Sequence, residues 1–166
     1  NPLPSRLGET SVSFGGRELP LLQVNSAQVL AQLPYDADSG LTSQLVVRRG
    51  QSASAPESVA IASSTPRVFT TDGSGQGQGV IVDAATGLLA GDDSPLSAGQ
   101  RVYIYAAGLG AVTPLIEAGS AAPPDALPSV VNPVRVLFDG IPAQVESAVL
   151  ASSDLQGAEK WLERLR

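Results

Sequence analysis

Two stretches of the sequence repeat one pattern: VSFGGRELP at residues 12–20 and VLFDGIPAQ at residues 136–144. Each reads Val-x-Phe-x-Gly and reaches a proline within four residues of the glycine. Alternate residues of a strand point to opposite faces of a sheet, so the Val and the Phe of each stretch share one face. The glycines then supply a turn. The repeat therefore predicts two β-hairpins, each presenting two apolar side chains to a core.

The rest of the chain continues the β pattern. After the first glycine turn, LPLLQV (19–24) is predicted to return as the second strand of that hairpin, with Leu22 and Val24 facing the core. Further strands are predicted within residues 41–50, 57–63, 79–87, 99–110 and 132–140. Short strands separated by Gly and Pro turns are typical of β-sandwiches.

Composition limits the functions that are open to the chain. Hydrophobic residues make up 43% of its 166 residues and charged residues 16%, which is typical of a folded domain rather than a disordered one. A net charge of −6 argues against binding to nucleic acid. No apolar run approaches the about 20 residues of a membrane span. The sequence has no Cys and no His, which removes thiol nucleophiles, Cys/His zinc sites and the commonest general base. We therefore expect that the protein is not an enzyme.

Four motifs occur in the order seen in one known family. They are LQVNSAQVLAQLPYD (22–36), RVFTTDGSGQGQG (67–79), GQRVYIYAAGLGAVTP (99–114) and VRVLFDGIPAQV (134–145). In these motifs the chain resembles the Solibacter-type uncharacterised C-terminal domain of exported bacterial proteins, over roughly residues 3–157. The hairpins look like those of IPT/TIG-type Ig-like domains. The resemblance implies an Ig-like β architecture and a secreted or cell-surface location. Because that family has no established activity, it implies no catalytic or binding residue.

Together, the strands and the resemblance predict an all-β fold of two Ig-like (IPT/TIG-type) β-sandwiches in tandem. The first sandwich is expected at residues 1–64, without its first strand, and the second at residues 65–166. The end of the chain is predicted as a short helix or a frayed tail. A helix fits because its apolar residues are spaced i, i+3, i+7 and i+10: Leu155, Ala158, Leu162 and Leu165.

A sandwich that lacks a strand exposes an edge of unpaired backbone groups. Two interpretations remain open. Chains complete one another head to tail and build an extracellular filament, or the sequence is a piece of a longer protein. The predicted function is a non-catalytic structural or interaction module, whose partner is another copy or other domains of the parent protein. The alternative is a carbohydrate- or surface-binding adhesion module.

Few residues stand out as candidates for a site. Asp36 and Asp38 resemble the start of a calcium loop, although Val47 stands where an EF-hand carries its glutamate. Turn chemistry is the favoured interpretation, and calcium the alternative; no other cofactor is expected. The same two interpretations apply to Asp72, Asp92 and Asp93. For contacts with a partner, the sequence offers the aromatic residues Tyr103, Tyr105 and Trp161.

Overall fold

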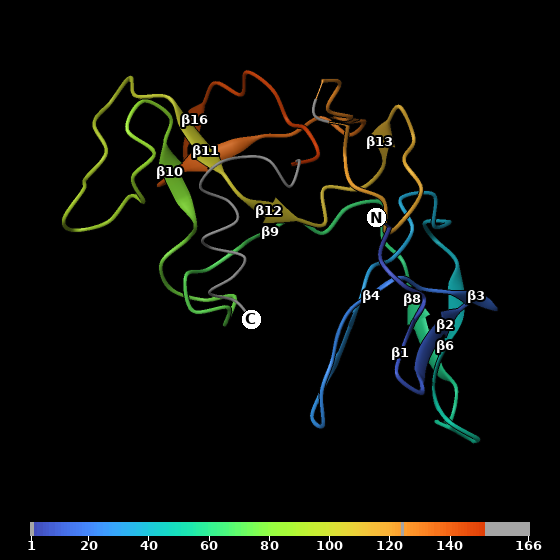
Figure 1. Cartoon of the computed structure of the whole chain (residues 1–166). Helices are drawn as coiled ribbons and strands as arrows, with labels where there is room; N and C mark the ends of the chain where they lie inside the picture. The colour runs from blue at the N-terminus through green and yellow to red at the C-terminus, as the bar shows by residue number, and fades with distance from the viewer. Residues whose placement is uncertain (1, 124, 152–166) are drawn as a thin grey trace. The chain divides into compact units, whose positions relative to one another are not determined.

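The computed structural model describes residues 2–123 and 125–151 of the chain. Within these ranges every regular element is a β-strand and none is a helix (Figure 1). The all-β class predicted from the sequence is therefore confirmed. No helix among the described residues is long and apolar enough to cross a membrane. The predicted helix or frayed tail, with Trp161, lies outside the described residues.

Contacts within the chain divide it into two units. The first comprises residues 1–63 and 110–152, and the described residues of the second are 64–109. Both Val-x-Phe-x-Gly hairpins therefore belong to the first unit by this division. The arrangement as two Ig-like sandwiches in tandem, with a boundary at 64/65, stays a prediction.

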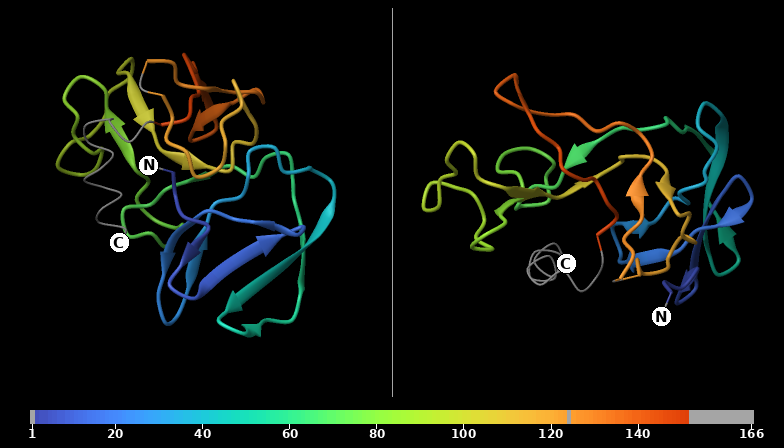
Figure 2. Two further views of the ribbon diagram at one scale, coloured as in Figure 1. Left: turned by 45° about the vertical axis from the view of Figure 1, so that its right-hand side comes forward. Right: turned by 90° about the horizontal axis from the view of Figure 1, so that it is seen from above.

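A six-stranded antiparallel sheet forms one layer of the first unit, with its two longest strands side by side in blue and teal in Figure 2. In its centre Val12 lies opposite Val47, and Phe14 opposite Leu45, so one face is apolar. The central strands are β2 (Thr10–Phe14) and β6 (Thr42–Arg49). Beside β2 lie β1 (Arg6–Leu7) and β3 (Arg17–Glu18), and beside β6 lie β7 (Ser52–Ala53) and β8 (Glu57–Ala60).

The hairpin of β4 (Leu21–Val24) and β5 (Val29–Ala31) packs against this face. The buried core consists of Val12, Phe14, Leu19 and Leu21, and it is flanked by half-buried side chains from both layers. The prediction of an inward Leu22 is wrong, because this side chain is 51% exposed whereas Leu21 is 1% exposed. The ladder shifts its register between Leu21 and Gln23, and this irregularity reverses the alternation.

The first predicted hairpin is also shorter than expected. Its turn at Gly15 and Gly16 is as predicted, but the returning strand is β3, whose Glu18 lies opposite Ser13. The LPLLQV segment pairs instead with β5. The amide of Leu19 still donates to the carbonyl of Val12 at 2.8 Å, and the chain then leaves the sheet and crosses to the opposing layer.

The later part of the first unit contains two small ladders. One consists of β13 (Val112–Thr113) and β14 (Ser129–Val130), and the other of β15 (Val136–Phe138) and β16 (Ile141–Ala143). Between β13 and β14, a turn holds the N-terminal segment, because the Leu3 amide donates to the Gly119 carbonyl over 2.7 Å. Gly119 is buried, and a Cβ there would lie 2.9 Å from the Cβ of Pro20.

The second unit is built from two short ladders. In one, β9 (Arg67–Val68) pairs with β12 (Ala106–Ala107), and in the other, β10 (Ile81–Asp83) pairs with β11 (Val102–Ile104). Its buried apolar side chains are Val80, Val82 and Ala90. The carboxylate of Asp83 accepts hydrogen bonds from the amides of Ala85 at 2.7 Å and Thr86 at 2.8 Å. These bonds give two backbone N–H groups of the turn after β10 their acceptor.

Candidate functional site

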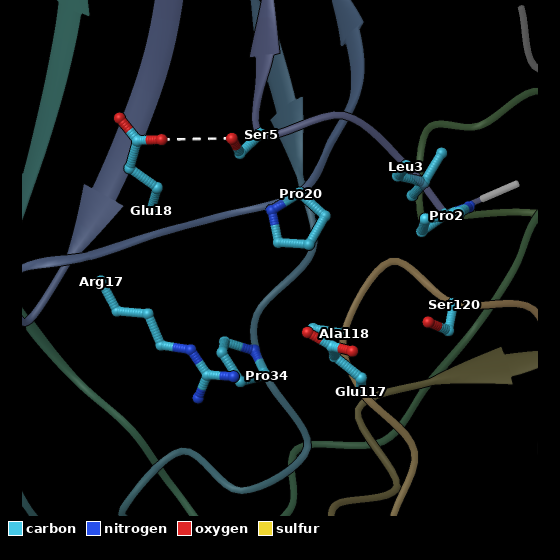
Figure 3. Close-up of a pocket in the computed structure, with 10 residues that line it drawn as sticks. All are labelled: Pro2, Leu3, Ser5, Arg17, Glu18, Pro20, Pro34, Glu117, Ala118 and Ser120. Carbon is cyan, nitrogen blue, oxygen red and sulfur yellow. Dashed lines mark hydrogen bonds between the residues drawn. The ribbon is translucent and has the colours of Figure 1, made fainter.

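A cavity of about 320 Å³ opens on the surface of the first unit (Figure 3). Its walls come from the N-terminal segment, the β3–β4 connection, the segment after β5 and the turn at 117–120. The apolar part of the lining consists of Pro2, Leu3, Pro20, Pro34 and Ala118. Cavities of this volume lie at the lower end of the range for small-molecule sites.

Most charged groups of this cavity are already paired. The guanidinium of Arg17 contacts both carboxylate oxygens of Asp36, at 3.1 and 3.3 Å. Glu18 accepts the hydroxyl of Ser5 at 3.1 Å, which Figure 3 draws as a dashed line, and it pairs with Arg6 at 3.4 Å. These pairs are exposed to solvent and contribute little to stability. They leave few charges in the cavity for a ligand.

The aspartates considered for calcium do not gather into a ligand shell. Asp36 lies against Arg17, and Asp38 is exposed two residues further on. The carboxylate of Asp72 accepts the amide of Ser74 at 3.0 Å and its hydroxyl at 2.8 Å. These hydrogen bonds hold the pKa of Asp72 below its ordinary value, as expected of a turn. Calcium binding stays a prediction.

Asp92 and Asp93 line a second, open cavity of about 520 Å³ in the second unit. Both side chains are exposed. Across residues 2–123 and 125–151, no three Asp or Glu side chains lie close enough together to hold a metal ion.

The two predicted contact tyrosines lie in the second unit. Tyr103, in the middle of β11, is 52% exposed, and Tyr105 follows the strand and is half-buried. Burial raises the pKa of Tyr105, and the nearby Tyr103 raises it further. The two tyrosines are two positions apart along the chain, which is the spacing of residues on one face of a strand.

Sequence reasoning missed the β15–β16 hairpin as an exposed apolar surface. It predicted Val136 and Phe138 on a core face, and for Phe138 this prediction is wrong, because the side chain is exposed. Leu137 is 58% exposed, Phe138 41% and Ile141 70%. Phe138 lies opposite Ile141 on one face, and Leu137 opposite Pro142 on the other. A signal was available in the run Val136-Leu137-Phe138, because consecutive apolar residues place apolar side chains on both faces of a strand.

Comparisons with known proteins found no match to the chain among family models, curated proteins or solved structures.

Proposed function

We propose that the chain is a non-catalytic structural or interaction module of a secreted or cell-surface bacterial protein, and that its copies associate by pairing strand edges. In this proposal its strands belong to two Ig-like, IPT/TIG-type sandwiches. The module binds through backbone ladders and apolar side chains rather than through a deep pocket. Head-to-tail contacts of this kind extend into an extracellular filament.

The β15–β16 hairpin is the observation that carries this proposal. An isolated two-stranded hairpin is at best marginally stable in water, and such a hairpin needs packing on at least one face. Here large apolar side chains stand exposed on both faces: Leu137, Phe138 and Ile141. A cluster of this kind is typical of a surface that a partner covers.

The β15–β16 hairpin pairs with no further strand among the described residues, and the six-stranded sheet offers another free edge, at β8. β8 pairs with β6 on one side, and no further strand among the described residues pairs with its other side. Edge strands of this kind accept an added strand from another chain. Two edges on each copy are sufficient to link copies into a continuous array.

Light scattering coupled to size-exclusion chromatography tests the proposal on the full chain over a wide range of concentrations. We expect the molar mass to rise with concentration, and electron microscopy to reveal extended particles where head-to-tail contacts dominate. A monomer at every concentration, with no particles on the grid, contradicts self-association.

A carbohydrate-binding module is the second candidate, and the tyrosines of the second unit favour it. Tyr103 is largely exposed and lies close enough to Tyr105 to influence its pKa. Neighbouring exposed aromatic rings are suited to stacking on sugars. A glycan array gives a strong signal in this case, which Tyr103→Ala removes and Leu88→Ala, at another exposed apolar residue, retains.

A further inference from the structure

We propose that two copies of this chain pair antiparallel through the outer edge of β15, on a twofold axis at Leu137. This pairing rests on the proposed function, because it names the partner and the surface through which the module associates. It is carried by three features of the β15–β16 hairpin: its turn, the proline in β16 and the residues along β15.

The turn decides which backbone groups of β15 face outward. Asp139 and Gly140 have φ values of 49° and 79°, which is the pattern of a two-residue type I′ turn. In such a hairpin the pair next to the turn, Phe138 and Ile141, exchanges hydrogen bonds across the hairpin. The next pair does not, so Leu137 directs its N–H and C=O away from β16. No third strand among the described residues pairs with this edge.

The opposite edge of the hairpin is blocked. Pro142 lies across from Leu137, at the position in β16 whose backbone nitrogen faces outward. Since proline has no N–H, it cannot donate a hydrogen bond to an added strand. Prolines on edge strands are a common way of preventing further pairing. A strand that joins this sheet therefore joins it at β15.

The residues of β15 are complementary to a second, antiparallel copy of themselves. With Leu137 opposite Leu137 of the second copy, Val136 lies opposite Phe138. Arg135, just before β15, then lies across from Asp139, the first residue of the turn. Opposite charges and apolar pairs directly across an antiparallel ladder both stabilise it. The twofold axis produces each of these contacts twice. In any other register, at least one of the two charged residues loses its counterpart.

The same register covers exposed apolar surface without gathering like charges. Leu137 and Phe138, which are 58% and 41% exposed, pack across the new ladder on its two faces. The whole chain has a net charge of −6, but the segment 133–143 holds one Arg and one Asp and is neutral. The contact segment itself therefore adds no net like-charge repulsion between the two copies. Because the contact is isologous, it closes as a dimer by itself, and growth of the dimer into an array requires a second contact, such as one at the free edge of β8.

Leu137→Pro tests the pairing directly, measured by sedimentation velocity on the full chain. This substitution removes the outward N–H of Leu137 and leaves the hydrogen bonds between β15 and β16 intact. We expect a dimer for the unaltered chain and a monomer for Leu137→Pro at the same concentration. Circular dichroism checks that the variant retains its β structure.

Arg135→Gln provides a second test that does not alter the backbone, with Arg67→Gln as its matched control. Both substitutions make the net charge more negative by one, but Arg67 is an exposed residue of β9 in the second unit, and only the first substitution removes a charge opposite Asp139. We expect Arg135→Gln to raise the dimer dissociation constant about 2- to 30-fold, since two cross-strand charge pairs are lost. Arg67→Gln is expected to change the constant less.

Hydrogen exchange completes the test. In the dimer the amide of Leu137 is protected, and dilution removes this protection, whereas the amide of Phe138 stays protected within the hairpin. A monomer at all concentrations overturns the pairing and self-association together. An oligomer that keeps its mass in Leu137→Pro, or that weakens equally in Arg135→Gln and Arg67→Gln, overturns the β15 contact alone. In that case the module associates through another edge.

Discussion

The amide of Gly119 donates a hydrogen bond of 2.9 Å to the side-chain carbonyl of Gln32, although 87 positions separate the two residues. The Nε2 group of the same glutamine donates to the hydroxyl of Tyr35 at 2.9 Å. One side chain thus connects the turn at 117–120 to the segment after β5. Together with the bond from the Leu3 amide to the Gly119 carbonyl, this link joins the two parts of the sequence that form the first unit.

Gln32→Met is expected to destabilise the protein by about 1–3 kcal/mol, because the buried amide of Gly119 loses its acceptor. Urea unfolding followed by circular dichroism measures the loss, and the amide of Gly119 should exchange faster with solvent. Gln28→Met, at an exposed position of the β4–β5 turn, is the control and should change stability little. Equal stability of the two variants contradicts the role of this link.

Gly119→Ala is expected to cost more than Gly16→Ala. The two glycines have nearly the same positive φ, 84° and 82°, so both substitutions carry a similar backbone cost of about 1–2 kcal/mol. Only the Cβ at position 119 meets a neighbour, Pro20, whereas nothing lies within 4 Å at position 16. The steric excess should be about 1–3 kcal/mol in urea unfolding. If the two glycines respond alike, the turn does not pack as closely as described.

Leu21→Ala and Leu22→Ala form a matched pair on one strand. Leu21 belongs to the core and is 1% exposed, so its truncation should cost about 2–5 kcal/mol. Leu22 is 51% exposed, and its truncation should change stability by no more than about 0.5 kcal/mol. Thermal or urea unfolding separates the two. If Leu22→Ala instead costs more stability than Leu21→Ala, then Leu22 faces the core, as the simple alternation of the sequence predicts.

Asp83 makes the stability of the second unit dependent on pH. Hydrogen bonds from the amides of Thr86 and Ala85 hold the pKa of Asp83 below its ordinary value of 3.8. Because the folded pKa is the lower one, this stabilisation is fully present above the unfolded pKa and is lost as the pH falls through the folded pKa. Asp83→Asn should therefore lower the thermal midpoint at neutral pH, and the difference should narrow below pH 3.8.

The control for this comparison is Asp92→Asn, which alters an exposed carboxylate for which the structure shows no hydrogen bond to another described residue. Its midpoint should follow that of the unaltered protein at every pH. A difference for Asp83→Asn that stays constant into acid shows that the charge of the carboxylate is not what stabilises the turn.

Tyr103→Phe is expected to lower the pKa of Tyr105. Burial keeps this pKa above the ordinary value of 10.0, and the charge of Tyr103 adds to the effect. Ultraviolet titration of the phenols measures the change. Tyr35→Phe removes the other tyrosine whose pKa is raised by burial, and it should leave Tyr105 unchanged. An unaltered Tyr105 in both variants shows that the rings of Tyr103 and Tyr105 lie apart.

Local sequence patterns predicted much of the β structure because strands and tight turns depend on neighbouring residues. The alternation of Val12 and Phe14 marked β2, and Asp139-Gly140 marked the turn between β15 and β16. In both cases the pleat and the turn geometry act within a few residues, so no distant contact is needed to select them.

Tertiary structure decided the features that depend on distant partners. The alternation rule assigned Leu22 to the core, but the irregularity between Leu21 and Gln23 turned it outward. The hydrogen bond between Gln32 and Gly119 has no local signature in the sequence. A glutamine side chain and a backbone amide each have many possible partners, and only the fold brings these two together.

The sequence by itself determined an all-β chain with glycine turns and without the thiols and imidazoles of common active sites. These properties follow from composition and from the two-residue period of a strand, which are local. Only the tertiary structure decided that residues 110–152 join the first unit and that Leu137, Phe138 and Ile141 remain exposed. Burial is set by which segments meet in space, and the free energy of those contacts is shared between residues far apart in the chain.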